Sequence, residues 1–149
     1  GLDDALEAGA DVIMGVYNFL RPEHASVFAR AKARGIGVVA IAPLAQGLYR
    51  RGFFRAGTAA DVWRIARALA RNRQEIVRAR AARAILESFN GLTPAQAALA
   101  FVRANADIDI AVTTTTSLKR LEETLDGAAK PVPPRIGALC DLDAGRSGP

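Results

Sequence analysis

Three short runs of mostly apolar, often β-branched residues stand out along the chain, at residues 11–17, 36–42 and 108–113. Each run is too short for a typical helix and has the composition of a β-strand. The middle run is apolar without alternation, which is typical of a strand covered on both faces by helices in a parallel sheet. The pattern therefore predicts three strands of a parallel sheet.

Helical periodicity fills the spaces between these runs. Residues 22–34 place Val27, Phe28 and Ala31 on one face, and Gly35 provides a stop. Two arginine-rich segments, residues 60–70 and 73–89, are also predicted to be helical. The apolar face expected for the second of these consists of Val77, Ala81, Ala84 and Ile85.

Two further helices have start signals in the sequence. Thr93-Pro94-Ala95-Gln96 has a capping residue, a proline at the first helical position and a glutamine that can reach back to the cap, so a helix is expected to about Ala104. Ser117 can cap a helix over residues 118–125. A short helix is expected at residues 136–142, and residues 1–7 resemble the last turns of a helix that begins upstream. The helix over residues 118–125 is expected to bury Leu118, Leu121 and Leu125.

Alternation of strand and helix predicts right-handed parallel crossovers, which place the carboxyl ends of all strands at one edge of the sheet. Ligands of α/β proteins bind at that edge. Function is therefore expected near Tyr17, Pro43 and Thr113, and residues 43–59 are expected to form a long loop there.

Composition narrows the architecture and the compartment. The 149 residues are 50% hydrophobic and 23% charged, with a net charge of +5; this size suits one domain, whereas a complete (β/α)8 barrel needs about 250 residues. The single cysteine, Cys140, cannot form an internal disulfide and gives no zinc site, and no apolar run reaches membrane-spanning length. These features predict a soluble, cytoplasmic protein without membrane partners or bound metal.

The segment that follows the third predicted strand has the residues of an anion site. Hydroxyl groups at residues 113–116 precede a helix start, and Lys119 and Arg120 add positive charge one turn later. The alternative interpretation is a well-capped helix without a ligand. In the preceding loop, Pro43 and Gly47 suit a turn that closes over a ligand, or simply an ordinary turn.

Four segments, in order, resemble the aldo-keto reductase family. Tyr17-Asn18-Phe19-Leu20 is similar to the family's Tyr-Asn-Leu-Leu after the sixth barrel strand, and residues 35–40 lead into its Pro-Leu-x-x-Gly loop after the seventh strand. Residues 92–102 resemble the helix before the eighth strand, and residues 115–125 resemble the segment that binds the cofactor phosphate. The resemblance implies NADPH-dependent reduction of aldehydes or ketones by an α/β protein of the (β/α)8 type.

The resemblance further implies that this chain is a partial barrel, with strands six to eight in residues 1–130 and an extension, partly loose, in residues 131–149. The family's catalytic Asp, Tyr, Lys and His would lie upstream, so no catalytic residue is assigned and the chain alone is expected to be inactive. Its expected partners are the missing amino-terminal half, NADP(H) and a small carbonyl substrate. The cofactor-binding positions implied by the resemblance are Ile41, Ala42, Leu44, Gln46, Gly47, Thr114, Thr115, Arg120, Glu123 and Thr124.

Two positions depart from the family pattern. Met14 stands where many members have a glutamine that binds the nicotinamide carboxamide, and Ile41 stands where many have an aromatic residue. These departures motivate an alternative, a non-catalytic NADPH-binding or interaction module of the same fold. The arginine-rich residues 50–83 also admit a nucleic-acid interface, but they contain no recognised nucleic-acid-binding motif, and such a charge run is typical of a solvated face.

Overall fold

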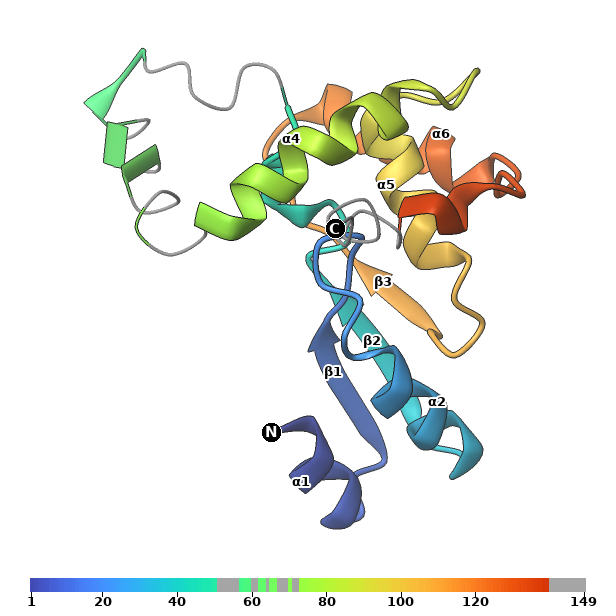
Figure 1. The fold of residues 1–149 in the computed structure, drawn as a ribbon. Helices are drawn as coiled ribbons and strands as arrows, with labels where there is room; N and C mark the ends of the chain where they lie inside the picture. Colours follow the sequence, from blue (N-terminus) through green and yellow to red (C-terminus); the bar gives the residue numbers. More distant parts are fainter. Residues whose placement is uncertain (51–56, 60–61, 64, 67–69, 71–72, 140–149) are drawn as a thin grey trace, which may run out of the picture.

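The computed structural model describes residues 1–50, 57–59, 62–63, 65–66, 70 and 73–139, and strands and helices alternate along much of this part of the chain (Figure 1). The expected helix at residues 60–70 and the loop tip at residues 51–56 lie largely or wholly outside the described residues. The described elements are α1 (Leu2–Glu7), β1 (Val12–Val16), α2 (Ala25–Ala33), β2 (Gly37–Ile41), η1 (Ala45–Gly47), α4 (Arg73–Glu87), α5 (Pro94–Arg103), β3 (Ile110–Val112) and α6 (Leu118–Ala129).

The three strands form one parallel sheet in the order β1-β2-β3, as the sequence pattern predicts. Figure 1 shows their carboxyl ends pointing to the same side, with α4 across that end. β3 is shorter than the predicted run because Asp109 ends the ladder. The Asp109 N–H donates to the Val38 carbonyl. In return, the Val38 N–H donates at 2.9 Å to the Asp109 carboxylate, where a continuing strand would offer a backbone carbonyl.

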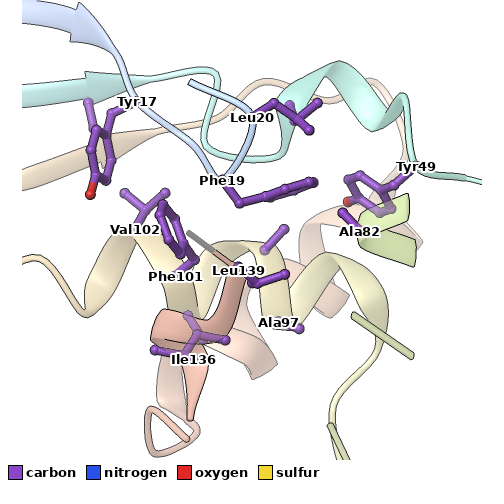
Figure 2. Packing of buried hydrophobic residues seen from close by; sticks show 14 of the residues in the cluster. Tyr17, Phe19, Leu20, Tyr49, Ala82, Ala97, Phe101, Val102, Ile136 and Leu139 are labelled. Atoms are coloured by element: carbon purple, nitrogen blue, oxygen red, sulfur yellow. The ribbon is translucent and has the colours of Figure 1, made fainter. Parts of the chain in front are cut away.

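Helices cover one face of this sheet. Ile13, Gly15 and Tyr17 alternate toward that face, and an ideal Cβ at Gly15 would lie 3.2 Å from the Phe28 ring of α2. The Tyr17 ring lies 5.7 Å from the ring of Phe28 and 5.6 Å from that of Phe101, which belongs to α5 (Figure 2). Burial of these large side chains is the main source of stability on this face.

The opposite face of the sheet is apolar and uncovered in the part of the chain that is described. Alternation places Val12, Met14 and Val16 of β1 there, and the parallel register adds Ile110 and Val112 of β3. Met14 and Ile110 remain 56% and 57% exposed. Parallel sheets are normally covered on both faces, so this apolar face resembles a protein core from which the covering layer is missing.

α5 and α6 pack closely through a polar junction. The Thr93 capping box forms as predicted, with its side chain accepting the Gln96 N–H. The buried Gln96 side chain then crosses to α6, where its Nε2 donates to Asp126 at 2.7 Å and to the Glu123 carbonyl at 3.1 Å. Gly127 allows this approach, because an ideal Cβ there would lie 2.7 Å from Gln96 Cγ.

Two predicted helix faces are wrong. Of the face predicted for α4, Val77 is 57% exposed and Ala81 and Ala84 are exposed, whereas Ile85 is partly buried against the core. This helix has small or apolar residues on more than one side, so its periodicity did not determine the face that packs. The buried positions are instead Ile76, Ala79, Ala82 and Leu86.

α6 is also oriented differently from the prediction. Leu118, Leu121 and Leu125 are 71%, 43% and 61% exposed, and the helix packs on α5 through Gly127. The polar junction with Gln96 therefore determines which side of α6 meets α5, and the leucines form an uncovered stripe.

Residues 136–139 form a short 3-10 turn whose Ile136 and Leu139 are buried beside α5 (Figure 2). The rest of the helix expected at residues 136–142 lies outside the described residues.

The close contact at Gly127 gives a stability prediction. Gly127→Ala should lower the free energy of unfolding by about 1–3 kcal/mol, because the new methyl group meets Gln96 in a packed junction. Gly137→Ala is the control, since its Cβ would meet nothing within 4 Å. Denaturation of both variants tests this, and equal stability of the two would contradict it.

The uncovered sheet face predicts self-association of the 149-residue chain on its own. Replacing both Met14 and Ile110 by lysine should shift the chain toward monomer in sedimentation velocity, because charged side chains would then stand on the apolar face. Val77→Lys is the control, since Val77 is equally exposed but lies on α4. A monodisperse monomer of the unmodified chain would refute the prediction.

Candidate functional site

The carboxyl edge of the sheet brings two of the predicted site segments together. Val16, Ile41 and Val112 lie in one row across the three strands. The chain therefore leaves the sheet at neighbouring points, toward Ala42 after β2 and toward Thr113 after β3. This is the edge at which the sequence analysis placed function.

The loop after β2 has an unusual backbone. Ala42, Ala45 and Gln46 have φ values of +54°, +45° and +53°, and Gly47 follows at +71°. Only the glycine adopts this left-handed region without steric cost; each of the other residues costs about 1 kcal/mol or more. Sequence reasoning anticipated a close turn at Gly47 but not the three left-handed residues that precede it.

Hydrogen bonds within this loop hold it as a series of tight turns. The Ala42 carbonyl accepts the Ala45 N–H at 3.0 Å, and the Leu44 carbonyl accepts the Gly47 N–H at 2.9 Å. Leu44 itself is right-handed, at φ −90° and ψ 17°, directly before left-handed Ala45. A right-handed residue followed by a left-handed one is the backbone order of an anion-binding nest, but here the Ala45 N–H at its centre already donates to the Ala42 carbonyl and is not available to a ligand.

The side chains of this loop contribute little polar chemistry. Ile41, Ala42, Leu44 and Gly47 are half-buried, and only Gln46 is exposed. A ligand at this loop would therefore be held mainly by backbone groups. Such recognition suits phosphate groups, which require convergent donors and no particular side chain.

The segment after β3 ends in a helix start without a side-chain cap. Ser117 is the N-cap residue of α6, but its hydroxyl makes no capping hydrogen bond, and its N–H instead donates to the Thr115 hydroxyl at 3.1 Å. Thr114, Thr115 and Arg120 are exposed. Arg120 is thus an exposed cationic residue in the first turn of α6, near the positive end of the helix dipole.

The remaining two predicted site residues already have partners inside the protein. The Thr93 hydroxyl donates to the Glu123 carboxylate at 2.6 Å, and the Thr124 hydroxyl donates to the Arg120 carbonyl at 2.8 Å. Glu123 therefore faces the start of α5. Both side chains can still accept a further hydrogen bond, but their present contacts stabilise α6 and its junction.

Both tyrosines and the histidine have packing or hydrogen-bond partners within the fold. Tyr17 is packed between two phenylalanine rings, and His24 is half-buried, with its Nδ1 donating to the Val16 carbonyl at 2.9 Å. His24 is thus held by the end of β1. Burial raises the pKa of Tyr49 to about 12, so its hydroxyl stays protonated at neutral pH.

Three residues without a role in the sequence analysis hold the edge together. The buried Asn18 donates to the Ala42 carbonyl at 3.0 Å. From α4, Arg78 donates to the Leu20 carbonyl at 3.0 Å and Arg83 to the Tyr49 carbonyl at 2.7 Å. These two arginines belong to the basic region considered for nucleic acid, and in the structure they brace loops. An asparagine directly after a strand was the available signal for Asn18.

The described residues lack two other kinds of feature. No group of three or more His, Cys, Asp or Glu side chains in this part of the chain could hold a metal ion. Within the same residues, no helix has both the length and the apolar character that a membrane crossing needs.

Comparison with known proteins supplies the family. Residues 3–135 match the aldo/keto reductase family, and this match includes every predicted site residue. Comparison with curated proteins gives no significant match. Members of this family are oxidoreductases with a TIM-barrel-like α/β fold, and they commonly use NAD(P)H. A match over most of the chain, together with the parallel sheet, leads to one conclusion: this chain belongs to the aldo/keto reductase family.

Proposed function

We propose that this chain forms the part of an aldehyde or ketone reductase that binds the phosphate and adenine end of NADPH. The observation that carries the proposal is the meeting of two anion-binding features at one sheet edge. They are the left-handed loop after β2 and the uncapped start of α6 after β3. The chain that carries both features belongs to a family whose members commonly use NAD(P)H.

The first feature suits the diphosphate of the cofactor. The backbone at Leu44 and Ala45 has the order of a nest, in which the N–H groups of Leu44 and Gln46 would face the diphosphate, and Gly47 allows close approach to the backbone. In the proposal, Ala42, Leu44, Gln46 and Gly47 surround the diphosphate, and Ile41 lies on the nicotinamide side, where many family members have an aromatic residue. The substrate carbonyl would be reduced by hydride from the nicotinamide, which is the chemistry that the bound cofactor supplies.

The second feature suits the 2′-phosphate that distinguishes NADPH from NADH. Arg120 can pair with a phosphate through two parallel hydrogen bonds, and Thr114 and Thr115 add hydroxyl donors. Arg120 is exposed and near the positive end of α6, so a dianionic phosphate gains from both charges. Glu123 and Thr124, farther along the helix, are proposed to contact the adenine side.

The uncovered apolar face supports the further proposal that these strands are the sixth to eighth of a (β/α)8 barrel. In such a barrel the inner faces of all strands pack against one another, which would cover Met14, Ile110 and Val112. The partner is then the amino-terminal half of the same barrel. That half would supply the catalytic acid–base residues, and it would also cover the open edges of β1 and β3.

The second candidate function is a non-catalytic NADPH-binding or interaction module of the same fold. Met14 and Ile41 favour it, because a thioether cannot reproduce the paired donor and acceptor of an amide and isoleucine has no aromatic face. The coding sequence directly upstream discriminates the two candidates. An in-frame barrel start with Asp, Tyr, Lys and His residues supports the reductase, and a start without them supports the module.

The role of Arg120 gives the direct test of cofactor choice. In the complete polypeptide, Arg120→Ala should weaken NADPH binding by about tenfold to a hundredfold, the effect of losing a charge-assisted bidentate contact. NADH binding should change by less than about twofold, because NADH lacks the 2′-phosphate that Arg120 would contact. Fluorescence titration with both cofactors measures the ratio.

Lys119→Ala is the matched control, since Lys119 is the exposed cation next to Arg120. It should reduce NADPH affinity only slightly, because an ammonium ion beside the site lacks the bidentate geometry. An equal loss of NADPH and NADH affinity on Arg120→Ala would reject the assignment to the 2′-phosphate.

A further inference from the structure

We infer that Asn18 is a positioning residue for the loop after β2: its side-chain amide holds left-handed Ala42 and thereby keeps the loop in its anion-binding shape. The identity of the ligand rests on the proposed function. The positioning role itself rests on the contacts of Asn18 and can be tested without a ligand.

Asn18 is 3% exposed and uses both ends of its amide. Its Oδ1 accepts the N–H groups of Leu20 at 2.9 Å and Arg21 at 3.1 Å. Its Nδ2 donates to the carbonyl of Ala42 at 3.0 Å, 24 residues away along the chain. The partners determine the orientation of the amide, because two N–H donors require the oxygen and a carbonyl requires the nitrogen.

Ala42 needs such support for two reasons. Its φ of +54° costs an L-residue about 1 kcal/mol or more. The following Pro43 also favours an extended conformation at the preceding residue, so local sterics drive Ala42 away from its observed geometry. A buried hydrogen bond contributes roughly 1 kcal/mol net, and without the Asn18 donor the Ala42 carbonyl would keep only the Ala45 N–H, which comes from within the strained loop itself. The Asn18 contact is therefore large enough to offset the strain.

The position of Asn18 links the loop to a braced part of the fold. The turn that Asn18 organises, residues 18–21, is held from α4 by Arg78 at the Leu20 carbonyl. The ion pair between Arg21 and Glu75 joins the same turn to the start of α4. Ala42 is thus tied through Asn18 to a turn that is itself fixed, and the loop begins from a constrained point.

The experiment separates the donor function of Asn18 from its role in the turn. Asn18→Asp keeps the oxygen that accepts the two N–H groups but removes the N–H that reaches Ala42. Asn105→Ala is the matched control, because the Asn105 side chain accepts the Asp107 N–H at 3.0 Å in a similar turn, directly before β3 at the other end of the sheet. Both variants are compared with the unmodified protein at equal temperature and pH.

Amide hydrogen exchange over residues 42–49 is the first measurement. In Asn18→Asp these amides should exchange about tenfold faster, as expected for loss of roughly 1.4 kcal/mol of local protection. In Asn105→Ala they should exchange as in the unmodified protein. Unchanged exchange in Asn18→Asp, or equal acceleration in both variants, would overturn the inference.

Rescue by glycine is the second measurement and distinguishes positioning from general destabilisation. NADPH affinity should fall about tenfold in Asn18→Asp, and adding Ala42→Gly should restore most of it, because glycine adopts the left-handed conformation without cost. The pair Asn18→Ala and Asn18→Ala with Ala42→Gly gives the same comparison if the buried carboxylate prevents folding. Absence of rescue, with exchange still fast, would overturn the inference.

The two hypotheses fail in different ways. If the unmodified protein does not bind NADPH, the proposed function fails, and hydrogen exchange alone then decides the role of Asn18. If NADPH binds but loop exchange is insensitive to Asn18→Asp, the proposed function stands and the positioning role is rejected.

Discussion

The parallel register of the three strands places Val16, Ile41 and Val112 in one row, and the rest of the structure depends on it. Residues that pair in a parallel sheet point to the same face, so this register separates an apolar face packed by helices from an apolar face that is open. It also determines where the chain leaves the sheet. The strained loop and the start of α6 can act on one ligand only because the strands that carry them end side by side.

Local signals in the sequence were sufficient for most of the architecture. The short β-branched runs predicted all three strands, and the Thr93 capping box predicted the start of α5 at Pro94. Faces of helices were harder to predict. In α6 the leucine stripe suggested a buried side, but the structure packs this helix through Gly127 against Gln96. A close approach between two helices depends on a residue in each, and periodicity within one helix does not contain that information.

The candidate site also has features that the sequence predicts and features that it does not. The segments after β2 and β3 could be predicted, because the carboxyl ends of parallel strands lie at one edge. The left-handed conformations of Ala42, Ala45 and Gln46 could not, since turn rules assign such geometry to glycine, asparagine or aspartate. Of the three, Ala42 has a hydrogen bond from a residue distant in sequence, Asn18, whereas Ala45 lies in turns closed by local hydrogen bonds. Strain at alanine is thus visible only once its partner is located.

The arginines of α4 show why charge composition alone was a poor guide to function. Arg78 and Arg83 direct their guanidinium groups to backbone carbonyls of loops at the sheet edge, and Arg21 pairs with Glu75. Guanidinium donors in these contacts stabilise the edge. Arg120, which is exposed at the start of α6, has no such role among the contacts described. The same residue type therefore braces the loops in one helix and is available for a ligand in another, and position relative to the strand ends distinguishes the two uses.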